Sequence, residues 1–184
     1  MYNTWEQRKL GDIAPLRGGY AFKSSMFTNQ GVPIVRISNI LSNGRIGGQF
    51  AYYPKNENDS NYVLPNKSTV IAMSGATTGK VAILFKPDNT KVYQNQRVGY
   101  FQRNELINYG FVSILVTTPH FKNLLNSTLV TGAQPNISPK DVNDFEFEIP
   151  ILINEQEKIG TVFSKIDNLI TLHQRRPYFL VNLT

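Results

Sequence analysis

The sequence contains no cysteine, and its 184 residues include only two histidines. Without cysteine, a disulfide framework and a thiolate zinc site are both excluded. The histidines, His120 and His173, lie far apart in the chain and lack the spacing of a dedicated metal centre. We therefore expect no bound metal and no cofactor. The lack of cysteine also agrees with a reducing compartment.

Long hydrophobic runs are missing as well. No segment approaches the roughly 18 consecutive apolar residues of a membrane-spanning helix, and the first residues lack the basic-then-apolar pattern of a signal peptide. The composition, 41% hydrophobic and 17% charged, is that of one domain able to bury a core, with an added element. We expect a soluble, cytoplasmic protein with no membrane partner.

Familiar catalytic motifs are absent from the sequence. No Asp or Glu is followed two positions later by Lys, as a nuclease motif of paired acids and a lysine requires. The chain also lacks the glycine-rich cofactor turn and the Asn-Pro-Pro-aromatic motif of methyltransferases, and it has no Gly-x-Ser-x-Gly nucleophile turn. We expect a recognition protein that is not itself an enzyme.

Charge is unevenly distributed along the chain. Residues 1–140 carry a net charge of +9, residues 141–157 hold six acids and no base, and the remaining residues carry +3. A basic body suits nucleic acid, because Lys and Arg that neutralise phosphates release condensed counterions. A basic surface without a polyanionic partner is the alternative. The acidic segment would repel DNA, so we expect that side of the molecule to face something else.

A loop at residues 74–79 joins two apolar runs, 69–73 and 80–85, and this pattern predicts a hairpin. Gly75 and Gly79-Lys80 superficially resemble a phosphate-binding loop. However, three residues separate the glycines instead of four, and Val81 replaces the metal-binding hydroxyl. The loop is suited to contact a DNA phosphate or base edge, and an ordinary hairpin turn is the alternative. Its candidate DNA contacts are Ser74, Thr77, Thr78 and Lys80.

Residues 92–101 form the richest candidate for sequence readout. Asn and Gln pair bidentately with adenine, and Arg with guanine, in the major groove. We interpret the segment as one strand, so that Gln94 and Gln96 share one face while Asn95 and Arg97 share the other. Either face is a candidate for base contact, and bracing of the fold by Gln96 and Arg97 is the competing interpretation.

Further candidate contacts come from three other segments. Residues 16–23 mix paired glycines with aromatic and basic residues, which is typical of a loop whose backbone approaches another surface closely. Residues 33–37 read as a strand, and residues 131–138 as a turn-rich loop. The candidates in these segments are Arg17, Lys23, Arg36, Ser38, Asn39, Gln134 and Asn136. Between them, residues 42–68 are a long excursion that carries Tyr52, Tyr53 and Tyr62.

Helical spacing dominates the second half of the chain. Residues 104–125 predict two core helices separated by a break before Pro119. Residues 145–149 alternate as a strand closed by Pro150, and a long amphipathic helix is expected from Asn154 to about Arg176. Its apolar stripe fits a partner helix or the helix's own domain equally well. The stripe consists of Ile159, Val162, Phe163, Ile166, Leu169, Ile170 and His173.

The order and spacing of these pieces resemble one known family. Residues 131–138, 149–150, 155–159 and 167–170 are similar to the end of a target recognition domain in the DNA-specificity subunit of type I restriction-modification systems. Residues 5–13 are similar to the opening segment of that domain, and residues 33–36, 74–82 and 95–98 to pieces between the two. The resemblance covers residues 5 to about 176.

The resemblance implies a fold, a function and partners. The expected fold is α+β: a mixed globular target recognition domain (1–150) with a twisted β-sheet and short helices, followed by one long amphipathic spacer or dimerisation helix (151–176) and a tail (177–184). The expected function is sequence-specific recognition of double-stranded DNA. Methylation and cleavage would be supplied by a modification (methyltransferase) subunit and a restriction subunit.

One departure from the family pattern concerns length. A complete specificity subunit carries two recognition domains and two long helices, whereas this chain has one of each. A half-length subunit could restore the two-domain geometry as a homodimer through the C-terminal helix. Two hypotheses of other classes remain: a protein-interaction module whose basic charge is incidental, and a carbohydrate-binding or other small-molecule domain that uses Tyr52, Tyr53 and Tyr62.

Overall fold

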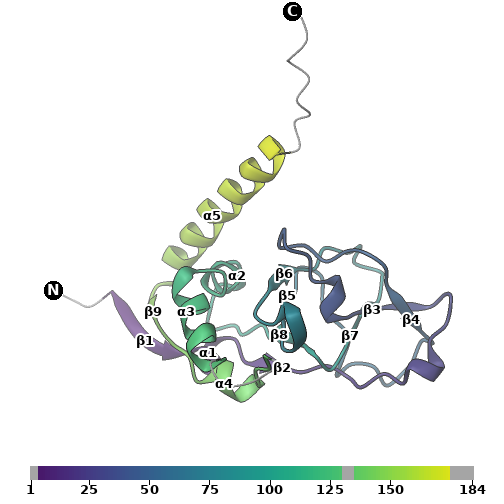
Figure 1. Ribbon diagram of the computed structural model, residues 1–184. Coiled ribbons are helices and arrows are strands. Elements are labelled where there is room, and N and C mark those ends of the chain that lie inside the picture. The colour runs from purple at the N-terminus through teal and green to yellow at the C-terminus, as the bar shows by residue number, and fades with distance from the viewer. Residues whose placement is uncertain (1–3, 130–134, 175–184) are drawn as a thin grey trace, which may run out of the picture.

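The computed structural model describes residues 4–129 and 135–174. Figure 1 shows a helical half from which one long helix projects, and a sheet-rich half beside it. This agrees with the expected α+β class and with a long helix at the end of the chain. None of the helices among these residues has the length and apolar character needed to cross a membrane.

A two-stranded ribbon joins the beginning of the chain to the strand that precedes the long helix. Strand β1 (Trp5–Lys9) pairs antiparallel with β9 (Glu146–Pro150), from Trp5 opposite Pro150 to Lys9 opposite Glu146. Both strands alternate in exposure, as expected for a ribbon with one face on the core. We call this element the β1–β9 ribbon.

Short helices pack against the inner face of the ribbon. They are α1 (Leu10–Ile13), α2 (Tyr109–Leu115), α3 (Pro119–Thr128) and α4 (Pro139–Asn143). The side chains of Asn108 and Thr118 cap α2 and α3 by accepting hydrogen bonds from backbone N–H groups. The two helices expected in residues 104–125 are thus confirmed. Helix α4 was not predicted, although the capping box between Ser138 and Asp141, with Pro139 between them, is a signal that the sequence contains.

The central sheet is antiparallel, in the order β2 (Leu16–Arg17), β8 (Val98–Phe101), β5 (Thr69–Ala72) and β6 (Val81–Ile83). The predicted hairpin is confirmed, because β5 and β6 pair antiparallel. A second, distal sheet has β3 (Val32–Val35) between β4 (Ala51–Tyr53) and β7 (Tyr93–Gln94). Short 3-10 turns occupy Ser24–Met26, Ile37–Asn39 and Gly75–Thr77.

The interpretation of residues 92–101 as one strand was wrong. Strand β7 ends at Gln94 and β8 begins at Val98, and the two belong to different sheets. A turn at Asn95 separates them, because the Val98 N–H donates to the Asn95 carbonyl at 3.0 Å and the Arg97 N–H donates to the Asn95 side chain at 3.2 Å. The expected alternation of faces from Gln94 to Arg97 therefore does not occur.

The long helix α5 (Ile153–Gln174) begins within a residue of the expected start. Its first turns pack on α2, and its later turns project away from the body (Figure 1). The buried Gln156 side chain donates to the Pro150 carbonyl at 2.8 Å and accepts from the Asn108 N–H at 2.8 Å. This side chain joins the ribbon, α2 and α5.

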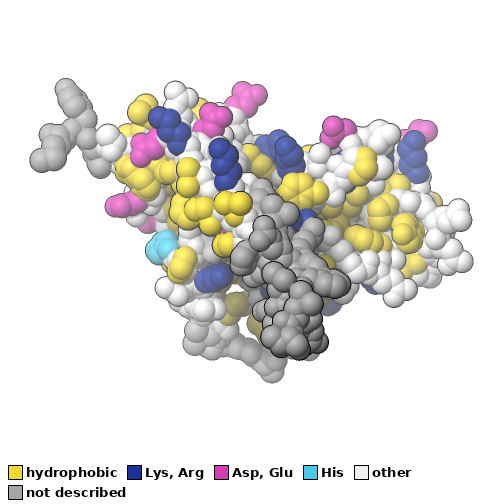
Figure 2. Space-filling view, turned by 90° about the horizontal axis from the view of Figure 1, so that it is seen from above, with side chains coloured by type: hydrophobic (Ala, Val, Ile, Leu, Met, Phe, Trp, Pro, Cys, Tyr) yellow, Lys and Arg dark blue, Asp and Glu magenta, His cyan; other side chains and the backbone are white. Residues whose placement is uncertain are grey.

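One part of the apolar stripe of α5 packs on the chain's own domain, and another part is free to meet a partner helix. Ile159 packs against the chain's own core, which corrects its assignment to a partner surface. Val162, Phe163, Ile166, Leu169 and Ile170 are exposed. The side chain of His173 is not among those that the structure describes. Seen from above, hydrophobic side chains also gather near the start of α5 (Figure 2), where Trp5, Ile151, Leu152 and Ile153 are exposed.

Gly160 sets how closely α5 approaches α2. A Cβ atom at this position would lie 2.8 Å from the Phe111 nitrogen and 2.9 Å from the Gly110 carbonyl carbon, both backbone atoms that cannot turn aside. Gly160→Ala should therefore lower the free energy of unfolding by about 1–3 kcal/mol, despite the better helix propensity of alanine. Urea denaturation measures the change. Ser164→Ala, at an exposed position of α5, is the control and should not destabilise the chain. Equal stability of the two variants would contradict the close packing.

Candidate nucleic-acid interface

Segments far apart in the sequence converge where β7 turns into β8. The Tyr20 N–H donates to the Gln94 carbonyl at 2.9 Å, and the Asn95 N–H donates to the Val35 carbonyl at 3.0 Å. On the other side of the turn, the Met73 N–H donates to the Arg97 carbonyl at 2.9 Å. We call the surface formed by residues 18–20, 35–38, 73–78, 95–97 and 135–137 the loop junction.

Residues 135–137 are bonded into the same junction. The Ile137 N–H donates to the Met73 carbonyl at 2.9 Å, and the Gly75 N–H donates to the Pro135 carbonyl at 3.2 Å. Ser74 and Asn136 face each other as an antiparallel bridge. Loops held by their own backbone groups leave their side chains free to meet a ligand, as a rigid reading surface requires.

Gly19 permits the closest contact in the junction. A Cβ atom there would overlap the carbonyl oxygens of Gln94 and Asn95. The paired glycines therefore allow a close backbone approach, as expected. However, the surface that they approach is the β7–β8 turn of the chain itself and not another molecule.

The predicted contacts that reach the surface of the junction are chemically suited to DNA. Gln96, Arg97, Asn136 and Ser38 are exposed, and Arg36 and Asn95 are half-buried. Amide and guanidinium groups of this kind pair with base edges or phosphates. The fold thus gathers on one surface side chains that are separated by up to about a hundred positions in the chain.

The hydroxyl groups of the 74–78 loop are turned inward, unlike our expectation of a hydroxyl surface. The Thr78 hydroxyl donates to the Gly75 carbonyl at 2.6 Å and lies 2.9 Å from the Pro135 carbonyl, so it braces the loop. The Ser74 and Thr77 hydroxyls are buried and have no hydrogen-bond partner among the described residues. Gly75 and Gly79, with φ of 77° and 84°, give this loop its left-handed turns.

Two predicted contacts are buried, which corrects their assignment to DNA. Gln94 is fully buried, and its side-chain nitrogen donates to the carbonyls of Arg17 and Val98 at 2.8 and 2.7 Å. Asn39 is also buried; it accepts from the Arg36 N–H at 3.0 Å and donates to the Gly47 carbonyl at 3.0 Å. Both amides brace the fold, because they satisfy backbone groups that are shielded from water.

Arg17 is drawn into the protein as well. Its guanidinium donates to the Gln94 side chain at 3.0 Å and lies over the Tyr100 ring, with its central carbon 5.1 Å from the ring centroid. Burial lowers the pKa of Arg17. The Arg17 side chain therefore supports the junction from within and does not extend from it.

The remaining predicted contacts lie apart from the junction or outside the described residues. Lys80 is exposed and donates to the Ser42 hydroxyl at 3.1 Å, in a groove of about 380 Å³ that Lys122 of α3 also lines. Lys23 is exposed and precedes the 3-10 turn Ser24–Met26. Gln134 lies outside the residues that the structure describes.

Tyr20 is a junction residue that the sequence analysis did not select. Its ring is 47% exposed and stacks on Tyr62 with a centroid distance of 4.8 Å. An aromatic residue beside paired glycines was the available signal. The carbohydrate hypothesis loses support here, because Tyr62 is buried and Tyr52 and Tyr53 are half-buried in β4. In the described part of the chain, no cluster of three or more His, Asp or Glu residues could hold a metal ion.

Comparison with known sequences gives one family and several relatives. Residues 2–179 match the model of the type I restriction modification DNA specificity domain. The chain is 28% identical over 178 residues to the MjaVIII specificity subunit of Methanocaldococcus jannaschii, covering 93% of this chain and 41% of that one. It is 30% identical over 182 residues to the EcoAI specificity subunit of Escherichia coli, covering 96% of this chain and 30% of that one. The chain thus spans less than half the length of these relatives.

Solved structures show a related fold. The HsdS subunit of Thermoanaerobacter tengcongensis superposes with a TM-score of 0.66 at 14% identity, over 97% of this chain and 41% of that one. A chain from a study of complex assembly and conformational transition in a type I restriction-modification system superposes with a TM-score of 0.69 at 13% identity, over 95% of this chain and 41% of that one.

Gln94 and Gln96 provide a matched pair of variants that tests whether the buried glutamine stabilises the fold and the exposed one does not. Gln94→Leu removes the side-chain donor to the Arg17 and Val98 carbonyls, and we expect a loss of about 1–3 kcal/mol of stability. Gln96→Leu, the same substitution at an exposed position, should change stability by less than about 0.5 kcal/mol. Chemical denaturation of both variants measures this difference. Similar stability of the two variants would show that Gln94 does not brace the junction.

Proposed function

The chain belongs to the type I restriction-modification DNA specificity domain family, and from this premise we propose that its loop junction reads a short sequence in duplex DNA. One observation carries the proposal: backbone hydrogen bonds hold the loops that carry Gln96, Arg97 and Asn136 next to one another, and all three residues are exposed. These are the side-chain types that discriminate adenine and guanine in the major groove.

A short DNA sequence is enough for useful discrimination. If the exposed side chains read about four base pairs at roughly 1–3 kcal/mol each, discrimination of several kcal/mol is within reach. Arg97 and Gln96 follow one another on the β7–β8 turn, and Asn136 comes from the 135–137 segment bridged to Ser74. The half-buried Arg36 adds positive charge beside them.

The charge distribution also supports binding of DNA at the loop junction. The body carries a net +9 over residues 1–140, which steers it towards phosphates, whereas residues 141–157 hold six acids. Glu146 and Glu148 are exposed on the β1–β9 ribbon, at the helical end of the molecule. DNA bound at the loop junction keeps away from these carboxylates.

The family is that of the DNA-specificity component, and the curated relatives are specificity subunits of type I restriction enzymes. This agrees with the expectation that the chain is a reader without its own chemistry. We infer that a modification (methyltransferase) subunit and a restriction subunit supply methylation and cleavage at the site that the junction selects. The function of this chain is then to direct those two subunits to the target sequence.

The free part of α5 provides a means of setting spacing between two readers. With 22 residues at roughly 1.5 Å each, the helix is about 33 Å long, close to one turn of DNA. Val162, Phe163, Ile166, Leu169 and Ile170 remain exposed along it. Antiparallel pairing of this stripe in a two-fold dimer buries it and presents two junctions to a symmetric, interrupted site.

DNA reading is tested by removing one junction cation. Arg97→Ala should weaken binding to a duplex selected from a random pool by about tenfold or more, because it removes a base or phosphate contact. If Arg97 contacts a phosphate, the slope of log K against log salt should also fall by about 1. Fluorescence anisotropy over a salt series measures both quantities.

Lys67→Ala is the matched control. It also removes one exposed positive charge, but Lys67 lies at the opposite end of the β5–β6 hairpin from the 74–78 loop. Its effect should stay near twofold, because salt screens charges beyond about 10 Å. Equal loss in both variants, affinity that does not depend on salt, or equal affinity for all duplexes would refute reading by the junction. Any of these results would favour the hypothesis of a protein-interaction module.

Pairing through α5 makes a separate prediction. Leu169→Lys places a charge in the exposed stripe and should convert a dimer into a monomer in sedimentation at micromolar concentration. Thr161→Lys adds the same charge on the polar face of α5 and should leave the dimer intact. A native chain that stays monomeric both free and on DNA contradicts the dimer but not DNA reading.

A further inference from the structure

The outer edge of β9 is an unpaired strand edge. Within the described residues, β1 is the only strand bonded to β9. The Leu10 N–H donates to the Phe145 carbonyl, and the Ile151 N–H donates to the Thr4 carbonyl. Because backbone directions alternate along an antiparallel pair, Phe147 and Ile149 also face β1. The N–H and C=O groups of Glu146 and Glu148 consequently point away from the ribbon.

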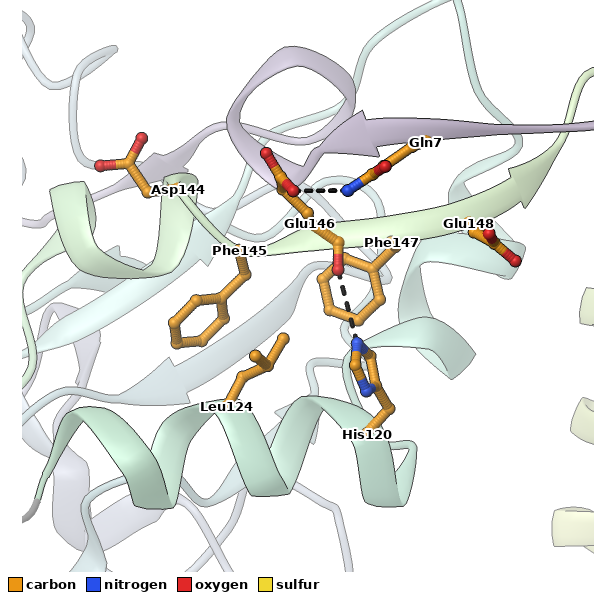
Figure 3. A pocket seen from close by; sticks show the side chains of 8 residues that line it. All are labelled: Gln7, His120, Leu124, Asp144, Phe145, Glu146, Phe147 and Glu148. Carbon is orange, nitrogen blue, oxygen red and sulfur yellow. Dashed lines mark hydrogen bonds between the residues drawn. The ribbon is translucent and has the colours of Figure 1, made fainter.

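A groove follows this edge between β9 and α3. Figure 3 shows β9 with β1 on one side and α3 on the other, and the side chains of Leu124, Phe145 and His120 between β9 and α3. The groove has a volume of about 480 Å³. The His120 ring lies edge-on to Phe147 with centroids 5.3 Å apart, and its Nε2 atom lies 3.4 Å from the Glu146 carbonyl oxygen. The Glu146 carbonyl is thus bonded to His120, whereas the N–H of Glu146 and the N–H and C=O of Glu148 face the groove without a partner among the described residues.

The rim of the groove is acidic. Asp144, Glu146 and Glu148 line it and are exposed. Lys9 pairs with Asp144 at 3.1 Å, and the neutral Gln7 bonds to Glu146. Among the described residues neither Glu146 nor Glu148 forms a salt bridge, and Lys9, which lies opposite Glu146 in the ribbon, pairs with Asp144 instead. Leu124, Phe145 and Phe147 provide apolar surface below this rim.

We propose that the β9 edge binds an extended basic segment of a partner protein, which adds as a strand beside β9. An added strand would lie about 4.8 Å from β9 and would bond to the Glu146 N–H and to the N–H and C=O of Glu148. Alternate side chains of such a segment point to opposite faces. Basic residues would then meet the carboxylates, and apolar residues would cover the Leu124 side of the groove.

Charge selects this occupant over the other candidates. Duplex DNA is repelled by the carboxylates, and a second copy paired through the same edge would bring its own Glu146 and Glu148 beside them. The docking surface lies on the ribbon and not at the loop junction, so it is independent of DNA reading. A partner bound there and DNA bound at the junction can occupy the chain together.

A pair of pentapeptides tests the proposal with the intact chain. The probe Lys-Val-Lys-Val-Lys should bind, and Glu-Val-Glu-Val-Glu should bind at least about tenfold more weakly, because opposite charges pair across strands. Amide hydrogen exchange should show new protection of the Glu146 and Glu148 N–H groups with the basic peptide. Excess duplex DNA should not displace this peptide from the chain.

Charge reversal supplies the matched variants. Glu148→Lys should weaken binding of the basic peptide by about tenfold. Glu57→Lys, which changes an exposed acid in the distal half, should leave the affinity for this peptide unchanged. Neither variant should lose affinity for the selected DNA. Equal binding of both peptides, protection elsewhere than on β9, or no binding would overturn the proposal. The two glutamates would then serve only to keep an open edge from aggregating.

Discussion

The arrangement of the molecule depends on one buried side chain, Gln156. It bonds to the last carbonyl of β9 and to the N–H that precedes α2, and so it fixes the first turns of α5 against both. A buried amide with both ends satisfied has one favourable position, because any other leaves polar groups shielded from water and unpaired. The close contact at Gly160 then holds α5 against α2 for another turn. Beyond it the helix projects from the body with its apolar stripe exposed.

The β1–β9 ribbon separates two kinds of surface. It joins the start of the chain to the base of the helix, and its outer face carries acidic side chains. The loop junction, by contrast, combines cations and amides at the β7–β8 turn. Positive charge attracts phosphate and negative charge repels it, so this division agrees with the proposed binding of DNA at the loop junction and of a protein segment at the ribbon. The proposed docking edge and the proposed reading surface follow from one charge distribution.

Recognition by loops requires that the loops be held still. In the loop junction this is done by backbone hydrogen bonds and by buried side chains, chiefly Gln94, Asn39 and Arg17, which do not reach the surface. Gln96, Arg97 and Asn136 remain exposed, and these are the side chains that we propose to meet a base. The buried supporting side chains and the exposed side chains are of the same chemical types, arginine and amide, so they differ in where the fold directs them.

The sequence by itself determined the features that are local. Helical and strand periodicity located the hairpin, α2, α3 and most of α5, and the run of acids marked the ribbon and the base of the helix. The tertiary structure decided which of the polar candidates are exposed. Gln94 and Gln96 are two positions apart and chemically identical. One is buried and the other exposed because the turn at Asn95 sends β7 and β8 into different sheets. Pairing between distant strands sets that outcome, and no local pattern in the sequence reports it.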